Sequence, residues 1–167
     1  KHVAESEAIK GLAVAFNLAV AESKSFLLTD NKFKVGKSIS NRVLNHIAEV
    51  DYRRGESVAF WLAGCEPGQE LLKRKNLKMA KAITVETLNL AVDNENGRGE
   101  TVVFQLCRSE TGTALLAQRN GLLLSRIEAA SINYIVQTGP HIGESAALLL
   151  SGSASGRALL CHDKFKL

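Results

Sequence analysis

One motif occurs four times in this chain at a fixed interval. The clearest copies begin at Gly55, Gly99 and Gly143, and they run GESVAFWLAGCEPGQELL, GETVVFQLCRSETGTALL and GESAALLLSGSASGRALL. A weaker copy begins at Gly11 and runs GLAVAFNLAVAESKSFLL. Successive copies lie 44 residues apart, as from 55 to 99. A period of this size predicts a repeat array, in which each unit buries its apolar face against its neighbours.

The positions that agree between copies are mainly apolar, and their spacing is helical. Residues 58–63 predict a short helix that is almost wholly apolar, as expected for a helix buried on several sides. Leu71 and Leu72 give a second helix its buried edge, and apolar residues between 79 and 92 predict a third helical stretch. Strand-like alternation is weak throughout. We therefore expect two or three helices per unit and an all-α solenoid.

Residues suited to helix starts recur in register with the motif. The hydroxyl residues expected to cap helices are Ser57, Thr101 and Ser145, with Thr84 inside the third stretch. Pro67 is placed to open the second helix. Glu56 and Glu100 are expected in the first turn of their helices, where the helix dipole favours a carboxylate.

The length of 167 residues suits one helical-repeat domain, 1–167. Its units are approximately 11–54, 55–98, 99–142 and 143–167. The chain begins with Lys1, and its last unit is partial, which is consistent with a fragment of a longer protein. The alternative is a natural capping helix at one end and a processed start at the other.

Composition excludes some classes of protein. No run of about 18 apolar residues occurs, so we expect no transmembrane segment. No signal peptide is visible, and the net charge of +4 is mild. Three cysteines without metal-ligand spacing predict small packing residues in a reducing compartment. We therefore expect a cytoplasmic protein. If it were a secreted effector, that compartment would be the host cytosol.

The sequence offers little catalytic chemistry. Gly36, Lys37 and Ser38 resemble part of a phosphate-binding loop, but Asn31 stands where that loop requires its first glycine. The four histidines are scattered and none is at ligand spacing from another. We therefore expect no catalytic residue, no metal and no cofactor, and the pattern indicates no particular oligomeric state.

A basic run could contact phosphates. It comprises Lys73, Arg74, Lys75, Lys78 and Lys81. The aligned residues of the following unit are mostly uncharged, so the charge does not form a ridge along the array. Repeat proteins that read nucleic acid use one reading position per unit. We favour a solvated surface here over a nucleic-acid site.

An asparagine recurs at the same position of three units, as Asn45, Asn89 and Asn133. Asparagine is a poor choice inside a helix. The interpretation that we favour is structural, with each side chain tying down a loop or helix end of a neighbouring unit. The functional alternative is a ladder that grips an extended peptide.

The best functional indication is one position of the repeat whose residue varies between the copies, although the positions on either side of it hold similar residues in every copy. It holds Asn17, Trp61, Gln105 and Leu149. Such tolerance suggests exposure, and an exposed tryptophan is a good interface anchor; packing of Trp61 on an adjacent helix is the alternative. The loops before each first helix vary too. We expect these loops to contribute further residues to the same surface, namely Tyr52, Arg53, Arg54, Arg98 and His141.

The unit resembles a known family of helical repeats. A Gly-x-Ser/Thr start, a short apolar helix, a glycine break and a Leu-Leu helix resemble the ankyrin repeat through Gly55, Ser57, Ala63, Gly68, Leu71 and Leu72. The Pro-Leu-His of that family is absent, and the period is 44 instead of 33. The Asn-bearing stretch is similar to a helix of armadillo repeats. Long, divergent ankyrin-like units also resemble those of effector proteins from intracellular bacteria.

This resemblance implies a protein-binding scaffold and supplies no catalytic residue. We therefore expect a non-enzymatic α-solenoid that binds a partner protein or peptide through its first helices and the loops before them. The alternatives are a nucleic-acid or anionic-surface binder that uses Lys73 to Lys81, and the repeat region of a larger enzyme.

Overall fold

The computed structural model describes residues 39–49 and 51–161, and the described part of the chain is all-α, with nine α-helices and no strand. The second unit holds α4 (Val58–Gly64), α5 (Glu66–Ala82) and α6 (Val85–Asn89), and the third holds α7 (Val102–Cys107), α8 (Glu110–Gly121) and α9 (Ala129–Asn133). The fourth holds α10 (Ala146–Ser151) and α11 (Ala154–Leu160), and α3 (Asn41–Leu44) precedes them all. Two 3-10 turns span Asp51–Arg53 and Leu124–Arg126. The first copy of the motif, with Asn17, and the Gly36-Lys37-Ser38 sequence lie outside the described residues.

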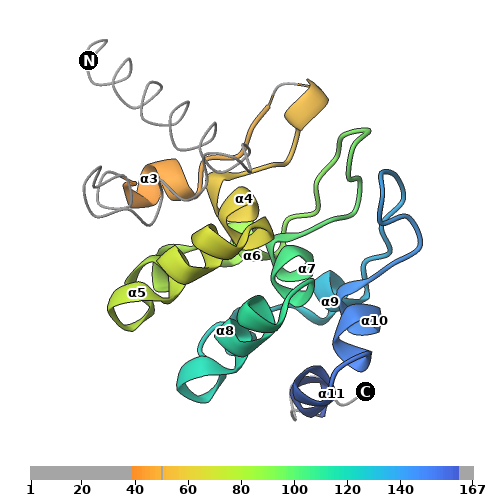
Figure 1. The fold of residues 1–167 in the computed structure, drawn as a ribbon. Coiled ribbons are helices and arrows are strands. Elements are labelled where there is room, and N and C mark those ends of the chain that lie inside the picture. The colour runs from red at the N-terminus through yellow and green to blue at the C-terminus, as the bar shows by residue number, and fades with distance from the viewer. Residues whose placement is uncertain (1–38, 50, 162–167) are drawn as a thin grey trace.

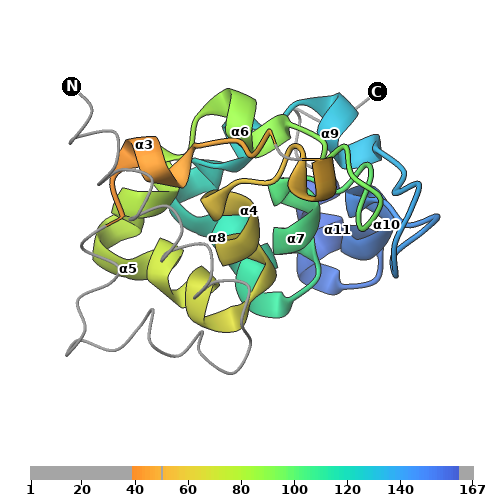
Figure 2. The same cartoon turned by 90° about the horizontal axis from the view of Figure 1, so that it is seen from above.

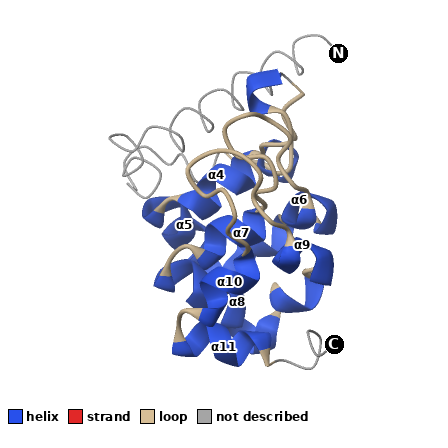
Figure 3. Ribbon diagram, turned by 90° about the vertical axis from the view of Figure 1, so that its right-hand side faces the viewer, coloured by secondary structure: helices blue, strands red, loops and turns tan. Residues whose placement is uncertain are grey.

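Equivalent helices lie side by side in rows. Helices α4, α7 and α10 form a central row, in which α7 contacts both of the others (Figure 1). On one side of it, α5, α8 and α11 form a second row, and on the other side lie α6 and α9 (Figure 3). Figure 2 shows the same order from above. The apolar core runs through all rows, from Val43 to Leu159.

The predicted caps are confirmed. Ser57, Thr101 and Ser145 are the N-caps of α4, α7 and α10, and each hydroxyl oxygen accepts the backbone N–H three residues later. Thr84 caps α6 in the same way. Pro67 lies in the first turn of α5, where its missing N–H costs no helical hydrogen bond.

Two expectations about helix bounds are wrong. Glu56 and Glu100 precede the N-cap residues and so lie outside the first turns. They are almost fully buried and bind side chains instead of the helix end. The third helical stretch ends at Asn89, because residues 90–92 turn into the following loop, where the N–H of Val92 bonds the carbonyl of Glu100.

The glycine that breaks each unit allows two helices to touch. A Cβ on Gly68, Gly112 or Gly156 would lie 2.3, 2.1 or 2.1 Å from a backbone oxygen of the helix before it. No side chain fits at such a distance. The glycine column therefore reflects the close approach of the second helix to the first in every described unit.

The loops that precede the first helices are narrow hairpins that project to one side (Figure 1). Each of the three described hairpins is closed by two backbone hydrogen bonds of one residue. In the second hairpin the N–H of Val92 donates to the carbonyl of Glu100, and the carbonyl of Val92 accepts the N–H of Gly99. Gly55, Gly99 and Gly143 have φ of 86°, 96° and 85°. Only glycine adopts this backbone without strain, which explains why each copy of the motif begins with one.

Two members of the asparagine column, Asn45 and Asn89, have the structural role that we favoured, whereas Asn133 donates to Ala129 of its own helix. The amide of Asn45 donates to the carbonyl of Ala82 at 2.8 Å, and its oxygen accepts the N–H of Thr84 at 2.7 Å. Asn89 makes the equivalent pair of bonds to Arg126 and Glu128 of the next unit. These amides are thus engaged by the chain's own backbone.

The basic run lies on both sides of a sharp turn. Lys75, Asn76 and Leu77 have φ between 48° and 64°, and this left-handed turn divides α5 into two helical pieces. The five basic side chains of the run are exposed, and the Nζ of Lys73 lies 3.7 Å from a carboxylate oxygen of Glu70. The charge is therefore distributed over a corner and not along one helix face.

None of the described helices combines the length and the low polarity that crossing a bilayer requires.

Candidate functional site

A groove lies between the central helix row and the hairpin loops. It has a volume of 610 Å³ and opens to solvent on one side. Its walls come from α4, α7 and the loops at 94–100 and 138–141. Three residues that the sequence placed on a binding surface line it, namely Trp61, Gln105 and His141. The fold therefore brings residues from two successive units, 55–98 and 99–142, to one concave site.

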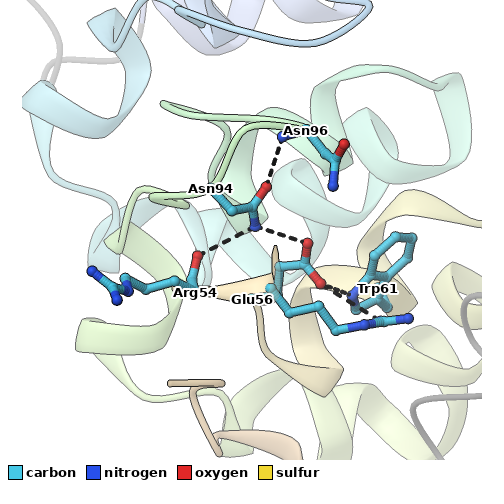
Figure 4. A network of polar contacts seen from close by, with 6 residues as sticks. Arg54, Glu56, Trp61, Asn94 and Asn96 are labelled. Carbon is cyan, nitrogen blue, oxygen red and sulfur yellow. Dashed lines mark hydrogen bonds and ion pairs between the residues drawn. The ribbon is translucent and has the colours of Figure 1, made fainter. Parts of the chain in front are cut away.

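Trp61 forms one end of the groove and is held by a polar network. Its indole Nε1 donates to Glu56 at 2.9 Å, and its ring lies edge-on to Phe60 (Figure 4). The ring is partly buried and packs against the core. Trp61 is thus both a packing residue and a groove residue, and the two alternatives from the sequence are combined in one side chain.

Glu56 is surrounded by donors. Besides Trp61, the amide of Asn94 donates to it at 3.0 Å, and the guanidinium of Arg53 lies 3.7 Å away (Figure 4). The same guanidinium lies 5.7 Å from the centre of the Trp61 ring, which is within cation–π range. Burial raises the pKa of Glu56, while the two hydrogen bonds and the charge of Arg53 oppose that rise.

Glu100 occupies the equivalent position of the next unit and also lines the groove. Its only side-chain hydrogen bond among the described residues comes from Gln105, at 2.5 Å. Burial raises its pKa to about 7; the charge of Arg108 and the Gln105 bond lower it, and the charges of Glu56 and Glu144 raise it further. Fewer groups therefore compensate the burial of Glu100 than compensate the burial of Glu56.

Gln105 does not have the exposure that its column suggested. It is 5% exposed, because Glu100 and Arg108 bind its carboxamide from two sides. The expectation of an exposed position is wrong for this residue. A position whose residue varies between repeats can still be buried when a side chain of the same unit forms a hydrogen bond with that residue, as Glu100 does with Gln105.

His141 closes the other end of the groove. Its Nδ1 lies 3.3 Å from a carboxylate oxygen of Glu144, and its ring packs at 5.7 Å from that of Phe104. The hairpin that carries His141 therefore rests on α7, the first helix of the same unit.

The remaining predicted surface residues lie on the hairpins outside the groove lining. Tyr52 is 68% exposed, and Arg54 is exposed as well. Arg98 forms an ion pair with Asp93 at 3.1 Å. The Asn45, Asn89 and Asn133 column lies on the opposite side, near α6 and α9, and does not line the groove.

Sequence reasoning missed a carboxylate column, Glu56, Glu100 and Glu144, whose first two members line the groove and whose third lies against His141. Glu56, Glu100 and Glu144 lie 44 residues apart, and the electrostatic coupling of Glu100 to the other two shows that the three are neighbours in space. The signal was present as a column of identical acids before each cap. Its position suggested helix-dipole stabilisation, and only the folding of the hairpins turned it toward the groove.

Comparison with known proteins adds no relative: no family model, no curated protein and no solved structure matches the chain. The ankyrin-like and armadillo-like resemblance therefore stays a resemblance of motif, and function has to be argued from the groove.

Proposed function

We propose that this chain is a solenoid of 44-residue helical repeats, and that it binds a segment of another protein in the groove between its first helices and hairpins. The observation that carries the proposal is that one groove is lined by residues from two successive units, 55–98 and 99–142. Adjacent units also repeat the same caps, hairpins and asparagine bonds.

The chemistry of the groove suits recognition of a peptide. Its lining combines the aromatic ring of Trp61 with carboxamide and carboxylate side chains. Clefts of this kind bury an extended segment and fix it by a few polar contacts. We propose a scaffold role in the cytoplasm instead of a catalytic one, as the resemblance to ankyrin-like arrays implies.

The test uses random peptides displayed on phage and selected on the folded protein. Asn96 is exposed, lines the groove and forms no side-chain hydrogen bond among the described residues, so Asn96→Trp should fill the groove without loss of a contact. Ala130→Trp is the matched control, because Ala130 is exposed on α9, away from the groove.

Selected peptides should bind the control variant as tightly as the unaltered protein, and they should lose at least ~10-fold in affinity for Asn96→Trp. Equal binding to both variants would place the peptide site elsewhere and overturn the proposal.

A further inference from the structure

Three residues before each acid of the carboxylate column lies a position whose residue differs between units. That position holds Arg53 before Glu56, Gly97 before Glu100 and His141 before Glu144, as 53, 97 and 141 are again 44 residues apart. In two units the side chain at this position approaches the acid, at 3.7 Å from Arg53 and 3.3 Å from His141. Two of the three acids thus have a basic partner within their own loop.

Glu100 lacks that partner, because Gly97 has no side chain to offer. A Cβ on Gly97 would lie 3.1 Å from the carboxyl carbon of Glu100, so this glycine sits directly against the acid. Within the described residues, no basic group lies within ion-pair distance of Glu100. Arg108, whose charge lowers the pKa of Glu100, donates to Gln105 at 2.8 Å instead.

The acid is nevertheless buried and faces the groove. Glu100 is 5% exposed, and it lines the groove together with Gly97 and Gln105. A buried carboxylate without a paired cation is costly, and the rise of its pKa to about 7 by burial reflects that cost. A cationic group that entered the groove and paired with Glu100 would lower the free-energy cost of burying this carboxylate.

We propose that the groove receives an arginine side chain of the bound segment, whose guanidinium pairs with Glu100 against Gly97. The inference rests on the proposed peptide-binding function and names the side chain that the peptide must carry. The partner supplies to Glu100 what Arg53 supplies to Glu56 within the chain. A guanidinium fits better than an ammonium, because its planar fork binds a carboxylate through two parallel hydrogen bonds and stacks on aromatic rings such as Trp61.

The first arm of the test compares peptides on unaltered protein. Arginine should be enriched at one position among phage peptides selected at pH 8. A synthetic peptide with that sequence is then compared with a copy that carries citrulline, which keeps the shape of arginine and lacks its charge. Fluorescence of Trp61, the only tryptophan of the chain, reports binding. The citrulline peptide should bind at least ~30-fold more weakly.

The second arm assigns the loss to Glu100. For Glu100→Gln, the arginine peptide should weaken by a similar factor, and replacement by citrulline should then cost little more. Gly97→Arg supplies the cation from within the chain. This variant should lower the pKa of Glu100, followed by carboxyl NMR, and should exclude the arginine peptide from the groove.

The outcomes separate this inference from the proposed function. Peptides that lose binding to Asn96→Trp, yet carry no enriched arginine or bind Glu100→Gln equally well, overturn the arginine pairing and leave the groove function intact. Absence of any peptide that depends on the groove overturns both. The citrulline comparison needs no protein variant and holds even if a substitution at Glu100 or Gly97 prevents folding.

Discussion

The side-chain oxygen of Asn89 accepts a hydrogen bond of 2.8 Å from the backbone N–H of Glu128, which lies 39 residues further along the chain. The amide of Asn89 also donates to the carbonyl of Arg126 at 3.0 Å. One side chain thus satisfies a donor and an acceptor at a turn of the next unit. This arrangement ties neighbouring units through their backbone, independent of which side chains the turn carries.

We expect Asn89→Ala to lower the free energy of unfolding by about 2 kcal/mol, because it leaves two backbone groups without partners. Asn133→Ala is the matched control, since Asn133 is exposed and, within the described part of the chain, its side chain bonds only to Ala129 of its own helix. It should cost less than ~0.5 kcal/mol. Urea titrations followed by circular dichroism measure both, and equal losses would show that the link between units contributes nothing.

The glycine contact between the two helices of a unit predicts a steric effect. A Cβ on Gly112 would lie 2.1 Å from the oxygen of Leu106, so Gly112→Ala should destabilise by at least about 2 kcal/mol. Gly152→Ala should be nearly neutral, because φ is −71° there and the nearest atom would lie at 3.4 Å. Thermal melting compares the two, and a stable Gly112→Ala would contradict the close approach.

Glu100 gives the stability a defined pH dependence. Its pKa is raised to about 7 by burial, so between pH 4.5 and 7 the folded state holds a proton that the unfolded chain has lost. Stability therefore falls as pH rises through this window, by up to about 3 kcal/mol from this group.

Glu100→Gln should remove that part of the slope and should be more stable than the unaltered protein at pH 8, with little difference at pH 5. Glu56, whose pKa burial also raises, leaves a residual slope in the variant. Urea titrations at several pH values test this. Parallel pH profiles of the two proteins would contradict the assignment to Glu100.

The cysteines should differ in reactivity toward a thiol reagent at pH 8. Cys161 is exposed, whereas Cys107 is buried and burial raises the pKa of its thiol to about 12. Cys161 should therefore react fast, and Cys107 only at the rate at which the protein opens. Cys161→Ser should abolish the fast phase. Cys65 is partly buried and burial raises the pKa of its thiol, so it should react more slowly than Cys161. A fast phase that survives in the double variant Cys65→Ser/Cys161→Ser would contradict the burial of Cys107 at the end of α7.

The sequence by itself determined the local structure. The 44-residue period, the apolar helical spacing and the hydroxyl caps specify where helices begin, because these signals act within a few residues of one another. The glycines at 55, 99 and 143 mark positions with positive φ for the same local reason. Trp61 and His141 could be assigned to one surface, because loops of successive units align.

Only the tertiary structure decided which of these residues share an environment. Gln105 is buried and Glu100 faces the groove because residues of the projecting hairpins line the same groove as α4 and α7, and no local pattern states that arrangement. The pairing of Arg53 with Glu56, and its absence at Gly97, becomes meaningful only when three loops lie side by side. Burial and electrostatic compensation depend on distances in space between units, which the spacing along the chain does not contain.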